Sequence, residues 1–321
     1  MESPRNHIET QKITKEYIAR TRKSAMLQHL LDRLKSQSEC DISISVNFQQ
    51  SSPFFLNDEN GDPIPLNIPA GGAIAGEFLS EGKYEATSVK VINSIINTFY
   101  KNFVFVDVGA NIGLISRQIL KLNPIELYCY EANPKVFGYL KRNLNTKANN
   151  INLLNGALWK DDTEINFRDT IEVDGYGSVN ADFFEKSVRI EKEKNNIKIK
   201  SYDVKKEIER WANSENPIIY KSDIQGADLD LLSYIVKNTT KKLTCIITEV
   251  SENEFHYLFG ELNSFLTEKN KSVIITKNKI IHKLTPTSSL NSLIEKNVRY
   301  IDLISLQDFE NTPWYQSLPA L

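Results

Sequence analysis

The most informative segment of the chain reads FVFVDVGANIGLIS and occupies residues 103–116. Its first four residues are apolar and rich in β-branched and aromatic side chains, which is typical of a strand buried on both faces. Asp107 ends that strand, and apolar side chains resume at helical spacing from Leu114 to Leu122. The small residues of the intervening turn are Gly109, Ala110, Asn111 and Gly113. A strand, a glycine turn and a helix predict the first half of a βαβ unit, which places backbone N–H groups beneath a cofactor.

The spacing of this turn distinguishes two classes of cofactor. A dinucleotide-binding turn has the pattern Gly-x-Gly-x-x-Gly, but here Asn111 and Leu114 stand at the second and third glycine positions after Gly109. The carboxylate of Asp107 lies just before the turn, where it would repel a pyrophosphate. It suits a ligand that carries an ammonium and a sulfonium group, and we therefore predict S-adenosylmethionine. The alternative is a glycine turn without a ligand, as any α/β domain can contain.

A second strand-like run, Glu126 to Tyr130, ends at an acidic residue. Glu131 can accept hydrogen bonds from both ribose hydroxyls, as the corresponding acid does in dinucleotide folds. Pro134 then opens a helix, where its missing N–H costs nothing. We expect Glu131 and its neighbour Ala132 to contact the cofactor.

Three motifs together resemble one known family. They are DVGANIG at 107–113, EANP at 131–134 and YKSDIQGAD at 220–228. The first is shared by many class I methyltransferases, and the combination resembles the FkbM-type S-adenosylmethionine-dependent methyltransferases over roughly residues 80–250. Gln225 and Asp228 depart from that family, which has Glu at both positions.

The resemblance implies a fold and a reaction. The fold is α/β and Rossmann-like, the class I methyltransferase fold, with a seven-stranded, mostly parallel sheet and helices on both faces. The reaction is O-methylation of a sugar hydroxyl on a glycan or a glycosylated metabolite. In this family a glycine and aromatic-acidic pair closes on the methionine end of the cofactor, so Glu85 is a candidate partner of its amino group. Glu85 is equally a candidate cap for the helix expected over 87–100.

The resembled fold also places the adenine ring beside the end of the third strand, expected over 151–158. The Asn155 side chain and the backbone near Ala157 are therefore candidates to bind the ring. Trp159 either packs in the core or forms a platform for the adenine. Residues 160–200 are expected to be an insertion near the substrate mouth.

Three residues are candidate bases for an alcohol acceptor. Asp223 lies at the C-terminal edge of the fourth strand, expected over 218–224, beside the crevice where open α/β sheets bind ligands. We favour it because burying a carboxylate without a purpose is costly. Glu249 ends the fifth strand at the same edge, and His256 borders the apolar face of a helix expected over 254–270. The base acts directly or through a divalent metal such as magnesium.

Further predictions concern the elements around this edge. Asp228 is expected to cap the helix that follows it. The segments 273–276 and 300–306 are expected to complete the sheet as an antiparallel pair.

The first 85 residues are expected to form a separate cap before a methyltransferase domain over 86–321. Helical spacing from Ile13 to Leu34 predicts a helix packed on the body of the protein or on a second copy, which would make a homo-oligomer. A helix on a membrane surface is the alternative. A strand over 41–47 and a hairpin over 54–66 are expected to follow.

The composition is that of an ordinary globular protein, with 40% hydrophobic and 25% charged residues in 321. A formal net charge of -2 argues against nucleic-acid binding. The three cysteines fit no metal spacing, and those in apolar runs predict buried thiols in a reducing compartment. No transmembrane run or signal peptide is evident, so a cytoplasmic protein is expected.

Other functions stay open at this stage. One alternative is a methyltransferase whose acceptor is a carboxyl, amine or phenol group of another small molecule. An NAD-dependent oxidoreductase is disfavoured by the two missing glycines. A non-catalytic binding subunit that kept the cofactor fold is the third alternative, and the departures at Gln225 and Asp228 keep it open.

Overall fold

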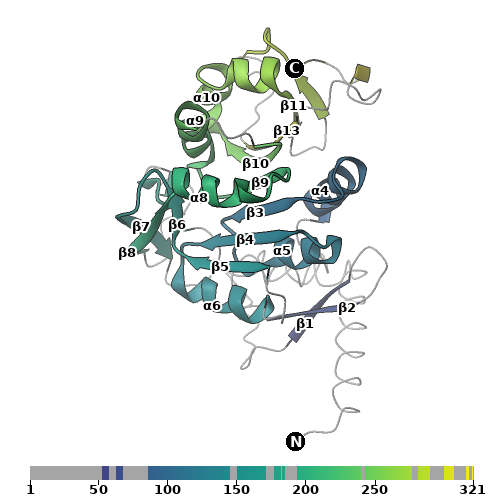
Figure 1. Ribbon diagram of the computed structural model, residues 1–321. Coiled ribbons are helices and arrows are strands. Elements are labelled where there is room, and N and C mark those ends of the chain that lie inside the picture. The colour runs from purple at the N-terminus through teal and green to yellow at the C-terminus, as the bar shows by residue number, and fades with distance from the viewer. Residues whose placement is uncertain are drawn as a thin grey trace, which may run out of the picture. The chain divides into compact units, whose positions relative to one another are not determined.

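The computed structural model describes the chain in two compact units, Met1–Tyr84 and Glu85–Leu321 (Figure 1). The described residues are 53–57, 63–67, 86–144, 150–170, 177–181, 183–184, 194–239, 243–276, 281–289, 300–306, 316–317 and 320. The predicted helix over 13–34, the strand over 41–47 and the candidate residue Glu85 lie outside them. In the first unit, β1 (Pro53–Asn57) pairs antiparallel with β2 (Pro63–Asn67), which confirms the pairing expected within 54–66.

The second unit is built on an eight-stranded sheet with the order β12-β11-β13-β10-β9-β3-β4-β5. The strands are β3 (Val104–Val108), β4 (Glu126–Glu131), β5 (Ile151–Asn155), β9 (Ile218–Ser222), β10 (Cys245–Ser251), β11 (Lys271–Thr276), β12 (Ile281–Leu284) and β13 (Tyr300–Leu306). The strands β10, β9, β3, β4 and β5 are parallel. β13 is antiparallel to both β10 and β11, so the predicted antiparallel pair is confirmed. β12 adds one strand to the seven that were expected.

This sheet is Rossmann-like because the chain reverses direction across it at β3. The chain first moves from β3 to β4 and β5, then returns to the other side of β3 to form β9 and β10. The switch point therefore lies between β3 and β9. Open α/β sheets bind ligands outside the carboxyl ends of the strands at such a point.

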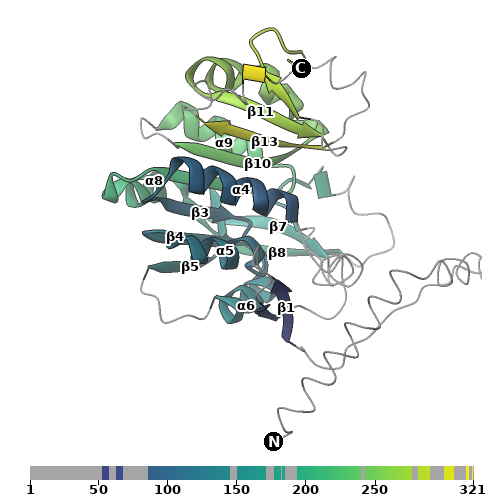
Figure 2. The ribbon, with the colours of Figure 1, turned by 90° about the vertical axis from the view of Figure 1, so that its right-hand side faces the viewer.

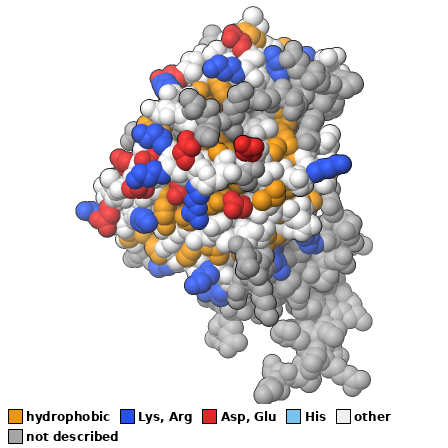
Figure 3. Space-filling view, viewed as in Figure 1, with side chains coloured by type: hydrophobic (Ala, Val, Ile, Leu, Met, Phe, Trp, Pro, Cys, Tyr) orange, Lys and Arg blue, Asp and Glu red, His pale blue; other side chains and the backbone are white. Residues whose placement is uncertain are grey.

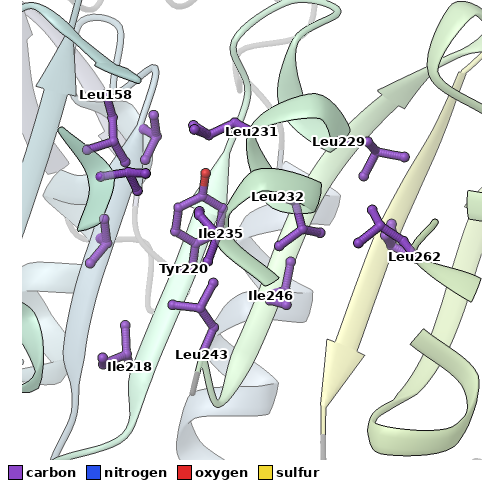
Figure 4. Close-up of a cluster of buried hydrophobic side chains, with 14 of the residues drawn as sticks. Leu158, Ile218, Tyr220, Leu229, Leu231, Leu232, Ile235, Leu243, Ile246 and Leu262 are labelled. Carbon is purple, nitrogen blue, oxygen red and sulfur yellow. The ribbon is translucent and has the colours of Figure 1, made fainter. Parts of the chain in front are cut away.

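Helices cover both faces of the sheet, as predicted (Figure 2). One face carries α4 (Ala86–Phe99), α5 (Leu114–Ile119) and α6 (Pro134–Asn143), and the other carries α8 (Val204–Trp211), α9 (Asp228–Asn238) and α10 (Phe255–Phe259). Side chains of β3 alternate between the two cores: Val104 and Val106 join one, Phe105 the other. Figure 4 shows the first core, where Leu232 and Ile235 of α9 pack toward Tyr220 of β9. The described helices include none long and apolar enough to cross a membrane.

Two predicted elements are interrupted by a glycine. The helix expected over 254–270 is instead the 3-10 turn η3 (Glu252–Glu254), α10, and the π-helical turn η4 (Phe265–Lys269). Gly260 ends α10 with φ -111° and ψ -107°, outside helical geometry. The strand expected over 151–158 is divided at Gly156 into β5 and β6 (Ala157–Trp159). A Cβ atom on Gly156 would lie 2.5 Å from the carbonyl oxygen of Lys200.

The predicted insertion over 160–200 contributes most of a separate three-stranded sheet with the order β6-β8-β7. β7 (Glu164–Thr170) is antiparallel to β8 (Lys194–Asp203), and β6 is parallel to β8. Phe167 and Asp169 project from the same face of β7 and are both buried, because side chains alternate along a strand. This sheet thus brings one aromatic ring and one carboxylate to the edge of the main sheet.

Candidate active site

A cavity lies at the carboxyl edge of the parallel strands, at the switch point between β3 and β9. Residues that follow or end β3, β4, β5 and β9 line it, together with residues of β6, β7 and the segment 177–179. Three lining residues carry carboxylates: Glu131, Asp169 and Asp223. Among the described residues that line this cavity there is no Lys, Arg or His. The cavity therefore favours a cationic ligand over an anionic one.

The glycine turn after β3 uses its own backbone donors. Gly109 and Ala110 donate to the carbonyl oxygen of Tyr130 at 2.9 and 3.0 Å. Asn111 donates to Glu131 Oε2 at 2.9 Å, Ile112 to Asn111 Oδ1 at 2.8 Å, and Gly113 to the Ala110 carbonyl at 2.9 Å. The expectation that this turn holds N–H groups beneath the cofactor is therefore wrong. A phosphate, which needs such donors, finds every N–H from residue 109 to 113 already engaged.

The turn nevertheless requires small residues, for reasons of backbone geometry. Gly109 has φ +73° and Gly113 has φ +85°, in the left-handed region that favours glycine. A Cβ atom on Gly109 would collide with the carbonyl oxygen of Asp223, and one on Gly113 would lie 2.8 Å from Leu140 Cδ1. Gly109 and Asn111 line the cavity, whereas Ala110 and Gly113 face the packing behind it.

Asp107 lies behind this wall rather than in the cavity. Its carboxylate is fully buried, 3.0 Å from Lys221 Nζ, and accepts a hydrogen bond from Ser116 Oγ at 2.5 Å. Lys221 Nζ also donates to the carbonyl oxygen of Gly109 at 3.2 Å. Because Lys221 balances its charge, Asp107 fixes the turn and does not present a carboxylate to a ligand. The repulsion of a pyrophosphate comes instead from the three carboxylates that line the cavity.

Glu131 lies in the wall of the cavity, at the end of β4. It is buried, lines the cavity, and accepts N–H bonds from Asn111 at 2.9 Å and from Asn133 at 2.8 Å. Burial raises the pKa of its carboxyl group to about 7, although the two N–H donors and Lys221 act in the opposite direction. Each carboxylate oxygen holds a second lone pair for a ligand hydroxyl. Ala132, also expected to contact the cofactor, lines the same wall.

Asn133 and Asp169 are site residues that the sequence prediction missed. Asn133 Oδ1 caps α6 by accepting from Lys135 and Val136, and its Nδ2 donates to Asp169 Oδ2 at 2.5 Å. Both residues are buried and line the cavity. Asn133 stands in the EANP motif, which could have indicated it. Asp169 had no local signal, because only the folding of the insertion brings it to this edge.

Asp223 lies in a sharp turn after β9. Its N–H donates to the Val108 carbonyl at 3.0 Å, and its Oδ1 accepts from Gln225 Nε2 at 2.7 Å. Gln225 and Gly226 have φ +56° and +81°. Ser178 Oγ donates to the Gln225 carbonyl at 2.7 Å, so the segment after β7 holds this turn in place. Asp223 lines the cavity, as expected.

The prediction that Asp228 caps α9 is wrong. Its Oδ1 and Oδ2 instead accept from the N–H of Ile224 at 3.1 and 3.2 Å, and so shape the Asp223 turn. The N–H of Leu229 in the first turn of α9 donates to Glu254 Oε1 at 2.8 Å. Burial raises the pKa of both Asp228 and Glu254, and the carboxyl groups of Glu254 and Asp223 raise the pKa of Asp228 further.

The other predicted residues are not all brought together. The Asn155 side chain donates to the Glu131 carbonyl at 2.9 Å, which ties β5 to β4, and only Ala157 of that pair lines the cavity. Glu249 is exposed on β10, and His256 is exposed with Nδ1 2.9 Å from the Asn253 carbonyl. Neither lines the cavity, so Asp223 is the one catalytic candidate there. No group of three or more His, Cys, Asp or Glu among the described residues could hold a metal ion.

Trp159, for which core packing and an adenine platform were both open, lines the cavity from β6. Val136, Leu158 and Phe167 are further apolar residues of the lining. The apolar side chains of the lining thus come from α6, β6 and β7, and Asp223 follows β9.

Solved structures show limited similarity to this chain. A precorrin 8w decarboxylase of Methanobacterium thermoautotrophicum is 14% identical, with a TM-score of 0.35 over 70% of this chain and 91% of that one. A SAM-dependent methyltransferase of Agrobacterium tumefaciens is 9% identical, with a TM-score of 0.36 over 83% and 71%. TYW2 of M. jannaschii, solved in complex with AdoMet, is 12% identical, with a TM-score of 0.34 over 77% and 83%. No protein-family model matches the chain, and no curated protein matches it.

Proposed function

We propose that this protein is a class I S-adenosylmethionine-dependent methyltransferase. The observation that carries the proposal is the acidic cavity at the switch point, with three lining carboxylates beside a glycine turn whose N–H groups are all engaged. A sulfonium and an ammonium group fit such a cavity. A pyrophosphate would meet carboxylates and find no donor in the turn, which disfavours the NAD-dependent alternative.

The polarity of the cavity orients the ligand. Glu131 in its wall accepts hydrogen bonds from the ribose hydroxyls. The apolar lining residues Leu158, Trp159 and Phe167 take the adenine ring, and the methionine part extends so that the transferred methyl group lies near the Asp223 carboxylate. This assignment removes the apolar faces of the adenine ring from water and places the positive charge of the ligand near a carboxylate.

When bound, S-adenosylmethionine supplies a methyl group made electrophilic by its sulfonium. The residues of the chain hold the reactants in line and exclude water, which accounts for most of the rate gain in reactions of this kind. Asp223 accepts the proton of the acceptor hydroxyl. Gln225, which donates to Asp223 Oδ1 at 2.7 Å, orients that carboxylate.

The acceptor is proposed from the resemblance to the FkbM-type family. We favour a sugar hydroxyl on a glycan or a glycosylated metabolite, ahead of a carboxyl, amine or phenol group. A non-catalytic binding subunit would bind the cofactor but methylate none of these acceptors. Acceptors should be screened with magnesium and with a chelator, since a divalent ion shared with the acceptor belongs to the same proposal.

Three further proposals concern the setting of the reaction. Cys129 and Cys245 are buried free thiols, which suits a reducing compartment, and we propose the cytoplasm. Acidic and basic side chains interleave on the surface seen in Figure 3, in keeping with a partner other than nucleic acid. Self-association through the predicted helix over 13–34 is testable by light scattering with a chain that lacks it.

Calorimetric titration of the full chain with S-adenosylmethionine, S-adenosylhomocysteine and NAD tests the proposed class. We expect micromolar binding of the first two and no heat from NAD. Binding of NAD alone would overturn the proposal.

A further inference from the structure

A short segment that follows β7, residues 177–181, contacts both the inserted sheet and the turn that carries Asp223. Two backbone hydrogen bonds fix it to β7: the Arg168 N–H donates to the Ser178 carbonyl at 2.9 Å, and the Ser178 N–H donates to the Arg168 carbonyl at 2.8 Å. Val179, the next residue, lines the cavity. The inserted sheet therefore reaches the cavity wall through this segment.

Two side chains of the segment bind carbonyl groups of the turn after β9. Ser178 Oγ donates to the Gln225 carbonyl at 2.7 Å. Asn180 Nδ2 donates to the Gly226 carbonyl at 2.7 Å, and its Oδ1 accepts from the Phe183 N–H at 3.0 Å. A Cβ atom on Gly226 would collide with the Phe183 ring, so this ring packs directly against the turn. The segment and the ring that follows it thus hold two consecutive residues of the turn.

The turn needs such contacts because of its backbone conformation. Gln225 has φ +56°, a left-handed conformation that is costly for a residue other than glycine and persists where the surrounding contacts hold it. In this conformation Gln225 Nε2 donates to Asp223 Oδ1 at 2.7 Å. Ser178 and Asn180 therefore act on the Asp223 carboxylate through Gln225.

We propose that Ser178 and Asn180 are positioning residues that hold the Asp223 carboxylate beside the sulfonium of bound S-adenosylmethionine. The inference rests on the proposed function, which places the transferred methyl group near Asp223. A carboxylate held in this place attracts the positive sulfonium but not the neutral thioether of S-adenosylhomocysteine. When the turn relaxes, the carboxylate moves away and the attraction falls, because the Coulomb energy declines with distance.

The test measures the ratio of the affinities for S-adenosylmethionine and S-adenosylhomocysteine, because the two ligands differ only in the methyl group and the charge at sulfur. Both are titrated calorimetrically into the natural protein and into the variants Asp223→Asn, Ser178→Ala and Asn180→Ala. Asp223→Asn should lower the ratio about tenfold, which is the low end of the effect of one opposite charge nearby. Ser178→Ala and Asn180→Ala should each lower it about three- to fivefold, because the carboxylate keeps its charge but loses its position.

A double variant distinguishes positioning from a general loss of structure. Asp223→Asn combined with Ser178→Ala should show the ratio of Asp223→Asn alone, since the hydroxyl group acts through the carboxylate. Asn238→Ala is the matched control: the Asn238 side chain also donates to a main-chain carbonyl, that of Tyr234 at 2.9 Å, but it is exposed at the end of α9. This control should keep the natural ratio.

The natural ratio in both Ser178→Ala and Asn180→Ala would overturn the inference and leave the proposed function intact, as would a further loss in the double variant. If Asp223→Asn keeps the natural ratio, the carboxylate does not lie at the sulfonium and the inference fails as well. If neither ligand binds the natural protein, the proposed function fails and this inference fails with it. Ser178→Ala removes one oxygen atom and keeps the backbone bonds to Arg168, so it decides the question even if Asn180→Ala does not fold.

Discussion

Replacing Glu131 with glutamine is expected to remove a steep pH dependence from ligand binding. Burial raises the pKa of Glu131 to about 7 against its ordinary 4.5, while Asn111, Asn133 and Lys221 lower it and Asp169 raises it further. Ribose hydroxyls donate to the carboxylate, so the ligand binds the ionised form. With a pKa of about 7, the ionised fraction grows from about 3% at pH 5.5 to about 90% at pH 8. Affinity should therefore rise about 30-fold over this interval.

The assay is calorimetric titration with S-adenosylhomocysteine at several values between pH 5.5 and pH 8. At pH 6.5, titrations in buffers of different ionisation enthalpy should show release of about 0.8 proton per ligand bound. Glu131→Gln keeps the shape but loses the charge-assisted bonds, so at pH 8 it should bind about 10- to 150-fold more weakly. Its affinity should change little with pH.

Glu131→Gln retains Asp169 and Asp223. A pH dependence of affinity that the natural protein and this variant share therefore comes from Asp169, Asp223 or other groups, and not from Glu131. Glu164→Gln, an exposed substitution of the same kind, should keep the full 30-fold change. A flat profile in the natural protein, or the same steep profile in Glu131→Gln, would refute the role given to Glu131.

Three other expectations follow from the same contacts. Gly109→Ala should lower the free energy of unfolding by more than about 2 kcal/mol, because φ is +73° and the new Cβ atom collides with the Asp223 carbonyl oxygen. Gly138→Ala is the control: this residue lies in α6, its added Cβ would have its nearest neighbour at 3.7 Å, and the change should be neutral or slightly stabilising. Thermal or denaturant unfolding measures both variants. Asp223→Asn should abolish methyl transfer while calorimetric affinity for S-adenosylhomocysteine stays within a few-fold, and unchanged turnover would remove Asp223 from the mechanism. The ligand-free protein should lose stability as the pH rises from about 4.5 to 7. Burial raises the pKa of Glu131 to about 7 and that of Asp302 to about 6 in the folded protein, so both residues bind more protons when folded than when unfolded. An unfolding temperature that rises across this interval would contradict the prediction.

Local pattern sufficed for the elements whose side-chain types and backbone conformation can be read from one continuous stretch of sequence. The apolar run before Asp107 lies in β3, the glycine turn follows that strand, and Glu131 ends β4, as predicted, although β3 contains Asp107 and ends at Val108. The wrong boundaries occur where a glycine interrupts a periodic pattern, at Gly156 and Gly260. Periodicity reports which face is apolar, but it does not report where the backbone turns.

The role of a polar side chain depends on what meets it across the fold, and this explains the differences at the site. Asp107 was expected in the cavity, yet Lys221, 114 positions later in the chain, reaches it and balances its charge behind the wall. Asp228 is the first residue of α9, but its carboxylate accepts a hydrogen bond from the N–H of Ile224. Glu254, from another element, accepts the hydrogen bond from the N–H of Leu229 in the first turn of the helix.

From its amino acids alone the chain specified a parallel α/β sheet, a glycine turn that excludes a dinucleotide pattern, and the acids that stand at strand ends. These depend on side-chain period and backbone conformation, which are local properties. Only the tertiary structure decided which carboxylates face the cavity, because Asp169 arrives on an inserted strand while Glu249 stays at the surface. Burial and pairing set the charge of each acid, and both arise from residues that are distant in the sequence and adjacent in the fold.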